Sequence, residues 1–284
     1  MKNTLLNLLA KLPIERFRNP RPVVGVLRFD GIISRSGGLG RQGISLASYE
    51  RAIDKLFESK NLKAVAVVVN SPGGSPVQSA LIAKRLRDLA AEKELPLVSF
   101  CEDVAASGGY WLACAGDQIF ADPNSIVGSI GVISAGFGFP ELIERFGIER
   151  RVYATNSRKG MLDPFQDEKP EDIDRLRGLQ EDIFENFKAH VRERRGDRLR
   201  ADETTLFCGD VWTGNQALEI GLIDGLTDMR TEMKRRYGAK VKFQSAELRR
   251  GLLSRLRMGR TLAIDPSHLV WALDDWSLWK RYGL

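Results

Sequence analysis

Stretches of β-branched and aliphatic residues alternate with amphipathic stretches along the first half of the chain. Residues 23–29 predict a first strand, and residues 62–69 (LKAVAVVV) form the nearly continuous apolar run that is typical of a parallel strand covered on both faces. Between them, the spacing of apolar residues predicts a helix over residues 48–59. Further strands are predicted at residues 95–100, 118–121 and 126–134. This alternation indicates an α/β fold with a parallel sheet and right-handed crossovers.

Two glycine-containing turns each join a buried strand to a helix. The first, residues 70–76 (NSPGGSP), leads from the strand at 62–69 into a helix. The second is expected to be a short turn at residues 101–106 that leads into residues 107–109 (SGG), whose two glycines open a helix. In an open parallel sheet the carboxyl ends of neighbouring strands line the ligand crevice, and helix N-termini favour negative charge there. The two turns therefore mark the expected functional site.

The second half of the chain is more charged. A long helix is predicted from Pro170, with an apolar stripe that includes Ile183, Phe187 and Val191, and a shorter helix is predicted at residues 215–220. A basic tail that contains tryptophans ends the sequence. No clean boundary interrupts the pattern, which indicates one domain with a C-terminal appendage.

Composition is that of a soluble globular protein, and it argues against two common catalytic designs. The chain has 284 residues, 43% of them hydrophobic and 28% charged, which suffices for one large α/β domain. Two histidines, His190 and His268, are poor material for a Ser-His-Asp triad or a multi-histidine metal site. Three cysteines without CxxC spacing support neither a disulfide framework nor a zinc site. If the chain is a hydrolase, we expect its base not to be histidine.

Charge and hydropathy narrow the choice of partners. The net charge of +6 comes with no recognisable nucleic-acid motif, so no nucleic-acid partner is expected. No stretch reaches the roughly 18 to 20 apolar residues that a membrane span needs, and no cleavable signal peptide is evident. Residues 1–12 form a short amphipathic face, and the tail combines Trp with Arg. Both features suit either a membrane surface or packing against protein.

Ser107 is the strongest candidate nucleophile. It would stand on a sharp turn from strand to helix, where the Gly108 amide and an amide from Gly73 or Gly74 are available to hold an oxyanion. Two plainer interpretations remain open at this point. Pro-Gly-Gly is common in ordinary turns, and a serine before Gly-Gly is commonly a helix cap.

A serine nucleophile needs a base, and the scarcity of histidine leaves lysine or a carboxylate. Lys159 is the only lysine between Lys93 and Lys169. To accept a proton from Ser107 it must be uncharged, which requires burial or a neighbouring cation such as Arg158. The alternative is that Lys159 is an ordinary exposed loop lysine.

Separated motifs in the sequence resemble, in order and spacing, those of the signal peptide peptidase A (protease IV) family. They are residues 70–74 (NSPGG), 105–113 (AASGGYWLA), 128–132 (GSIGV), Lys159, and 213–217 (TGNQA) continuing to 221–224 (GLID). The resemblance covers about residues 22–230, and the length matches the half-size members of that family.

The resemblance implies a ClpP/crotonase-like α/β fold with a parallel-sheet core and a serine endopeptidase with a Ser-Lys dyad and no metal or cofactor. The residues that it assigns are Ser107 as nucleophile, Lys159 as general base, Gly74 and Gly108 as oxyanion amides with Gly73 as the alternative to Gly74, and Ser129 as the hydroxyl that orients the lysine amine.

It also implies an organisation and a set of partners. We expect an N-terminal amphipathic and basic segment at residues 1–21, a peptidase domain at 22–240, and a basic, Trp-containing extension at 241–284. The expected partners are a peptide or protein substrate, such as signal-peptide remnants or fragments of membrane proteins, and further copies of the chain, with sites near the subunit interfaces. A cytoplasmic location with peripheral contact to the inner membrane fits this picture.

Two other functions remain as alternatives. A crotonase-like acyl-CoA enzyme also uses paired glycine amides, but it leaves Ser107 and Lys159 without roles. A catalytically silent, membrane-associated scaffold that binds peptides would be favoured if Lys159 were exposed, or if Ser107 failed to react with an electrophile.

Overall fold

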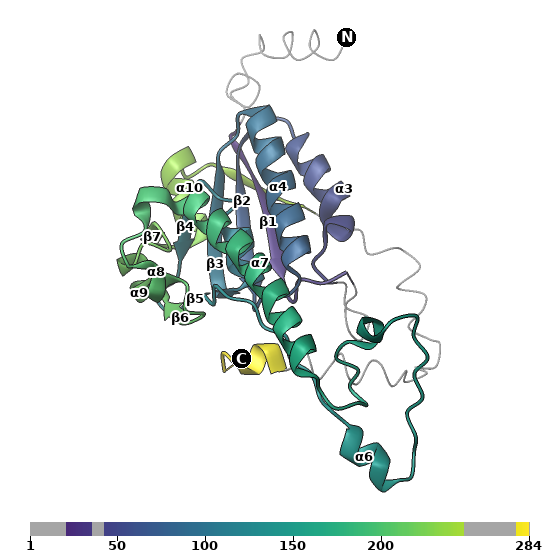
Figure 1. Ribbon diagram of the computed structural model, residues 1–284. Helices are drawn as coiled ribbons and strands as arrows, with labels where there is room; N and C mark the ends of the chain where they lie inside the picture. The colour runs from purple at the N-terminus through teal and green to yellow at the C-terminus, as the bar shows by residue number, and fades with distance from the viewer. Residues whose placement is uncertain (1–20, 36–42, 247–276, 284) are drawn as a thin grey trace, which may run out of the picture.

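The structure is a computed structural model that describes residues 21–35, 43–246 and 277–283 (Figure 1). Its strands are β1 (Val23–Asp30), β2 (Leu62–Ser71), β3 (Leu97–Ala106), β4 (Gln118–Ala121), β5 (Ile126–Gly128), β6 (Val211–Thr213), β7 (Gly225–Leu226) and β8 (Lys242–Ser245). Its α-helices are α3 (Leu46–Phe57), α4 (Pro76–Lys93), α5 (Gly108–Ala113), α6 (Pro140–Arg145), α7 (Pro170–Arg195), α8 (Glu203–Leu206), α9 (Gly214–Glu219) and α10 (Met229–Tyr237), and two 3₁₀ turns lie at η1 (Ser157–Gly160) and η2 (Gly196–Arg198).

The strands form a single, mainly parallel sheet. Its order is β6-β5-β3-β2-β1-β8, and β4 joins it by pairing with β3 and β7. Every pairing is parallel except that of β5 with β6. The parallel strands β1, β2 and β3 are connected through α3 and α4, as the alternating sequence pattern predicted.

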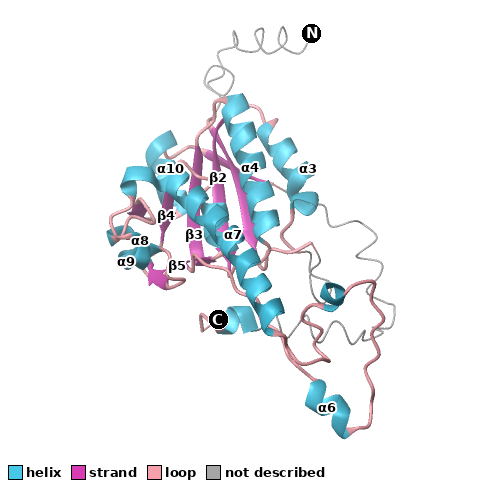
Figure 2. Cartoon of the chain, viewed as in Figure 1, coloured by secondary structure: helices cyan, strands magenta, loops and turns pink. Residues whose placement is uncertain are grey.

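Helices cover the two faces of the sheet unequally (Figure 2). Alternate residues of β2 point to opposite faces, so that Val65, Val67 and Val69 join the larger apolar cluster with α3, α4, α5 and α7. The other set, which includes Val68, packs in a smaller cluster with Met233 of α10. Burial on both faces explains why this strand reads as a continuous apolar run.

Two predicted elements differ from the structure. Residues 101–106, predicted as a turn, continue β3, because residues 104–106 pair with β5 while an irregularity in the β2–β3 register absorbs the polar pair Glu102-Asp103. The strand predicted at 126–134 ends at Gly128, where the backbone turns to positive φ. Strand β8 pairs with β1, so the sheet extends past residue 240, where the peptidase domain is predicted to end.

Several predicted features lie outside the described residues. They are the amphipathic segment before residue 21 and most of the Trp-containing tail. Among the residues that the structure describes, none of the helices combines the length and apolarity that a membrane crossing requires.

A buried ion pair fastens α7 to the sheet. Arg195 is almost fully buried, and its guanidinium donates to both carboxylate oxygens of Asp224 (2.7 and 3.1 Å) and to the Gly221 carbonyl. Asp224 also accepts the Ile119 amide of β4 (2.7 Å). Because every strong donor and acceptor in this group is satisfied, the pair ties α7, the Gly221 turn and β4 into one unit.

Replacing one partner of this pair should destabilise the fold. Arg195→Met removes the buried cation from Asp224 and leaves that carboxylate only its longer contact with the part-exposed Arg198 (3.5 Å), so we expect the free energy of unfolding to fall by about 3 kcal/mol. Urea denaturation followed by circular dichroism measures this loss. Arg177→Met is the matched control on the same helix, because the Arg177 side chain is 74% exposed, and we expect it to change stability by less than about 0.5 kcal/mol. Equal stabilities for the two variants would contradict the assignment.

Candidate active site

Ser107 occupies a strained turn between β3 and α5. Its backbone has φ 51° and ψ −122°, a conformation that residues with a Cβ rarely adopt. Two hydrogen bonds hold it there: the Ser107 amide donates to the Gly128 carbonyl (2.8 Å), and the Ser107 carbonyl accepts from the Trp111 amide (3.0 Å). A sharp turn from strand to helix of this kind exposes a nucleophile at the end of a sheet.

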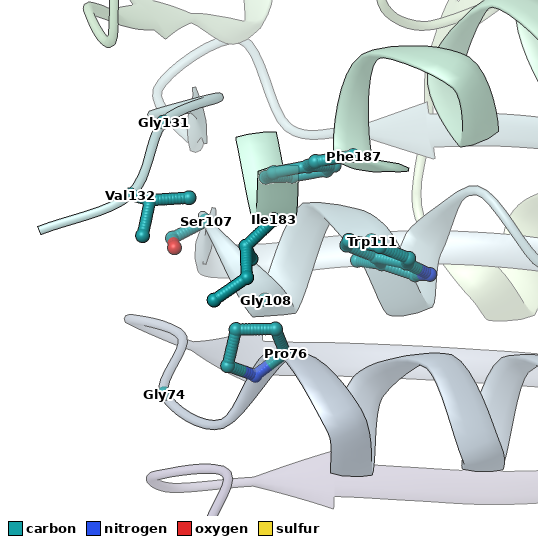
Figure 3. A pocket seen from close by; sticks show the side chains of 9 residues that line it. All are labelled: Gly74, Pro76, Ser107, Gly108, Trp111, Gly131, Val132, Ile183 and Phe187. Atoms are coloured by element: carbon teal, nitrogen blue, oxygen red, sulfur yellow. The ribbon is translucent and has the colours of Figure 1, made fainter. Parts of the chain in front are cut away.

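The Ser107 hydroxyl does not cap the helix that it precedes. Ser75, at the equivalent position before α4, does act as a cap, since its side chain accepts the Gln78 amide. No hydrogen bond engages the Ser107 hydroxyl within the described part of the chain, and its side chain lines a pocket (Figure 3). The structure therefore contradicts the interpretation of Ser107 as an ordinary helix cap.

The loop after β2 presents the amide of Gly74 toward the same place. Ile33 forms a parallel bridge with this loop, in which its amide donates to the Gly73 carbonyl and its carbonyl accepts from the Ser75 amide, both at 2.8 Å. In a parallel bridge of this kind the N–H of the central residue, here Gly74, points away from the bridging residue, here Ile33. A Cβ on Gly74 would lie 2.2 Å from the Ile33 carbonyl oxygen, and φ is +133°, so only glycine fits.

Gly73 approaches Ser107 closely but has its amide occupied. A Cβ on Gly73 would lie 2.8 Å from the Ser107 Cβ and 3.0 Å from the Gly108 nitrogen. Its amide donates to the Ser71 hydroxyl (3.2 Å). The amides of Gly74 and Gly108 make no hydrogen bond within the described residues, and a Cβ on Gly108 would lie 3.4 Å from the Gly74 nitrogen. These contacts favour Gly74 over Gly73 as the partner of Gly108.

Ser129 follows Gly128, whose carbonyl accepts the hydrogen bond from the Ser107 amide. It lies half-buried after β5 with φ 51°, and its own amide donates to the Asp210 carbonyl (2.7 Å). Its hydroxyl makes no hydrogen bond in the described part of the chain. The structure thus brings Ser129 to the neighbourhood of Ser107 through the adjoining backbone.

The pocket beside Ser107 is mainly apolar (Figure 3). Its lining residues come from four places in the chain: the loop after β2 with the start of α4, the Ser107 turn with α5, the segment after β5, and α7. They are Gly74, Pro76, Ser107, Gly108, Trp111, Gly131, Val132, Ile183 and Phe187. Trp111 and Phe187 stack with ring centroids 4.8 Å apart and form one wall.

Other ionisable side chains behind Ser107 remain protonated at neutral pH. Burial raises the pKa of Cys114 to about 11 and raises the pKa of Tyr110 well above its usual value. The Tyr110 hydroxyl donates to the Leu222 carbonyl (2.7 Å). Neither group supplies a nucleophile or a base that could replace Ser107 or its partner.

Lys159 lies apart from Ser107 in the single chain. It is exposed on η1, within a segment that projects from the body with α6 (Figure 1). The segment is held together by the Arg150–Asp163 ion pair (3.1 Å) and by contact between the rings of Phe139 and Phe165. Lys159 does not line the pocket, and its amine makes no ion pair within the described residues. Its role as base therefore stays a prediction.

The pocket wall is what sequence reasoning missed. Ile183 and Phe187 belong to the apolar stripe of α7, which the sequence predicts without a contact partner. Trp111 lies in the motif that carries Ser107. The i, i+4 spacing of Ile183 and Phe187 identifies one face of the helix, but no pattern in the sequence states that this face meets α5 beside Ser107.

Comparison with known proteins places these features in a family. The model for Peptidase family S49 matches residues 90–241, which is more than half of the chain and includes both Ser107 and Lys159. The chain belongs to peptidase family S49. The resemblance that the motifs suggested is thereby confirmed.

Two curated relatives show how far the similarity extends. The chain is 48% identical over 291 residues to a protein of Brucella abortus named Na(+)/H(+) antiporter NhaA; the match covers 99% of this chain and 39% of that protein. It is 31% identical over 217 residues to the serine protease SPPA, chloroplastic, of Arabidopsis thaliana, covering 72% of this chain and 31% of that protein. The chain thus spans less than half the length of either relative.

A solved structure supports the fold. A variant of 1510-N membrane-bound stomatin-specific protease, in complex with a substrate peptide, superposes with a TM-score of 0.51 at 16% identity, over 84% of this chain and 97% of that one. The predicted ClpP/crotonase-like α/β class is confirmed at the level of fold.

The Gly74 amide offers a direct test of the site geometry. In Gly74→Ala the added methyl collides with the Ile33 carbonyl and displaces the loop. We expect Ser107 to react with a fluorophosphonate about 100-fold more slowly, as is typical when one oxyanion donor is lost. Intact-mass spectrometry over time measures this rate.

Gly31→Ala is the matched control for backbone strain alone. Gly31 also has positive φ (+114°), but a Cβ there meets nothing within 4 Å. If Gly74→Ala and Gly31→Ala reacted at the same rate, the Gly74 amide would have no part in the site.

Proposed function

We propose that this protein is a serine peptidase that hydrolyses peptides through an acyl-enzyme on Ser107. The observation that carries the proposal is a strained Ser107 whose hydroxyl does not cap α5, together with the amides of Gly74 and Gly108, which are unpaired among the described residues, beside an apolar pocket. Membership of peptidase family S49 supports it.

The proposed reaction uses this chain's own groups at each step. The Ser107 oxygen attacks the scissile carbonyl, and the Gly74 and Gly108 amides donate to the oxyanion that forms. Lys159 accepts the Ser107 proton and returns it to the leaving amine, and Ser129 orients the lysine amine. Water then attacks the acyl carbon and gives a proton to Lys159. The bond between the acyl carbon and the Ser107 oxygen breaks, Lys159 returns the proton to that oxygen, and the carboxylic acid product is released.

A neighbouring copy of the chain is the proposed source of Lys159. In the single chain this residue lies on the projecting segment, which exposes large apolar side chains including Phe137 (77%), Phe146 (74%) and Tyr153 (93%). An exposed apolar surface of this extent is typical of a protein interface. Contact with a second copy would cover the segment and bring an uncharged Lys159 to Ser107.

Exposure of Lys159 is also the observation that favours the silent scaffold. A scaffold, however, has no need of a strained serine whose hydroxyl is left without a hydrogen bond, and strain of this kind persists where it serves chemistry. The peptidase is therefore the better account, and the reactivity of Ser107 decides between the two.

The pocket suits a small or apolar side chain next to the scissile bond. Its walls are Trp111, Phe187, Ile183 and Val132, with no charged residue among the lining groups. We propose short stretches of extended peptide as substrates, such as remnants of signal peptides or fragments of membrane proteins. Because the chain spans 39% of its Brucella relative, the antiporter name of that longer protein is not transferred to it.

Covalent labelling tests the nucleophile. A serine-directed fluorophosphonate should modify the wild-type protein at Ser107, and Ser107→Ala should abolish the modification without loss of folding. Lys159→Ala should lower peptide hydrolysis nearly as far as Ser107→Ala does, since the two residues act as one unit. Ser134→Ala, at an exposed serine in the segment after β5, is the control and should label normally. An assembled wild-type protein that resists labelling would favour the scaffold.

Mixing two inactive variants tests the source of Lys159. If a neighbouring copy supplies the base, co-refolded Ser107→Ala and Lys159→Ala chains should recover about a quarter of the wild-type rate, because random assembly pairs an intact Ser107 with an intact Lys159 at that frequency. Each variant alone should stay inactive. No recovery in a mixture that assembles normally would show that both residues act within one chain.

A further inference from the structure

His190 contacts Trp111, a residue of α5 that lines the pocket. It lies on α7, and its ring stacks on the ring of Trp111 with centroids 5.1 Å apart and planes 17° apart. Phe187, one turn earlier on α7, also stacks on Trp111. Trp111 lines the pocket beside Ser107. The histidine that sequence reasoning set aside as a base is therefore one residue removed from the pocket.

The His190 ring also makes a hydrogen bond to the backbone. Its Nε2 lies 3.2 Å from the Trp111 carbonyl oxygen. Because a carbonyl oxygen only accepts, Nε2 must carry the hydrogen, which leaves Nδ1 as the unprotonated nitrogen of the neutral ring. Burial lowers the pKa of His190, and Arg194 acts in the same direction, while the Trp111 carbonyl and Glu193 oppose them.

This bond satisfies one of several carbonyls, in α5 and in the turn after it, that side chains of neighbouring helices bind. The helix is only six residues long, and the carbonyls of residues 114–116 follow its end. Arg194 donates to the carbonyls of Cys114 (2.9 Å) and Gly116 (3.1 Å), and Arg87 donates to that of Ala115 (3.3 Å). His190 completes this set at the carbonyl nearest to Ser107.

The Trp111 backbone connects His190 to the nucleophile. The Trp111 carbonyl accepts from His190, and the Trp111 amide donates to the Ser107 carbonyl (3.0 Å). That second bond closes the first turn of α5, which also fixes the direction of the Gly108 amide. A short helix gains little rigidity from its own few hydrogen bonds, so contacts from outside determine where this turn lies.

We propose that His190 is a positioning residue for Ser107: by donating Nε2–H to the Trp111 carbonyl, it fixes the first turn of α5 and with it the Ser107 hydroxyl and the Gly108 amide. This inference rests on the proposed function, in which Ser107 is the nucleophile. His190 touches neither the pocket nor the substrate and takes no proton in the reaction.

Two substitutions separate the hydrogen bond from the ring. His190→Phe keeps an aromatic ring against Trp111 and removes the donor. His190→Gln removes the ring and keeps an N–H at the position of Nε2. If the hydrogen bond positions the turn, the rate at which a fluorophosphonate labels Ser107 should fall about fivefold in His190→Phe, the effect expected for one neutral hydrogen bond, and should stay near wild type in His190→Gln.

The alternative outcomes overturn the proposal. Equal labelling of His190→Phe and wild type would show that the donor is irrelevant. A lower rate for His190→Gln than for His190→Phe would assign the effect to ring packing alone. Asp182→Asn is the matched control: Asp182 is an exposed carboxylate on the same helix, and this variant should label at the wild-type rate.

A second variant and a second measurement guard against other causes of failure. If His190→Phe does not fold, His190→Asn replaces it. The Asn amide takes the position of Nδ1 and does not reach the Trp111 carbonyl, so we expect the same fivefold loss, about that of one hydrogen bond.

If wild type itself is not labelled, the proposed function fails, and hydrogen exchange of the peptide containing residues 107–113 tests the positioning separately. Faster exchange in His190→Phe than in His190→Gln supports it, and equal exchange overturns it.

Discussion

The left-handed turn at Ser107 is the constraint on which the rest of the site depends. A backbone conformation of this kind costs about 1–3 kcal/mol in a residue that carries a Cβ, so it persists only where surrounding contacts impose it. Here they come from separate elements: the Gly128 carbonyl at the end of β5, the Trp111 amide in α5, and Gly73, whose missing Cβ allows the loop after β2 to lie against Ser107. The same contacts turn the hydroxyl away from the helix and into the pocket.

One helix, α7, links this turn to the rest of the molecule. Its C-terminal half is anchored by the buried Arg195–Asp224 pair and binds carbonyls of α5 and of the turn after it through His190 and Arg194. Its N-terminal half leaves the body and joins the projecting segment that carries Lys159 (Figure 1). A helix of 26 residues spans about 39 Å, so α7 connects the immediate support of the nucleophile to the segment of the proposed base in one rigid element.

The sequence predicted the local elements of the site better than the way they meet. Apolar continuity identified β2, and Ser75 with the following proline marked the start of α4, because both signals act within a few residues. The extension of β3 through residues 101–106 was missed because Glu102 and Asp103 interrupt the apolar pattern, whereas pairing with β5 is a long-range contact. The sequence likewise predicts the apolar stripe of α7, which is a local pattern. The packing of that stripe on Trp111 and the hydrogen bond from His190 to the Trp111 carbonyl are long-range contacts, which no local pattern predicts.

The separation of Ser107 from Lys159 has a chemical consequence that a histidine-based hydrolase would not share. A lysine amine in water is protonated at neutral pH and cannot act as a base, whereas histidine is largely neutral there. In the proposed mechanism, a single copy with its lysine exposed holds a positioned serine that lacks its base. On the proposed mechanism, the contact that brings Lys159 to Ser107 also removes the amine from water and favours its uncharged form. The contact that completes the site would then be the same one that switches it on, so that the strained turn at Ser107 could be maintained in every copy while hydrolysis is confined to assembled ones.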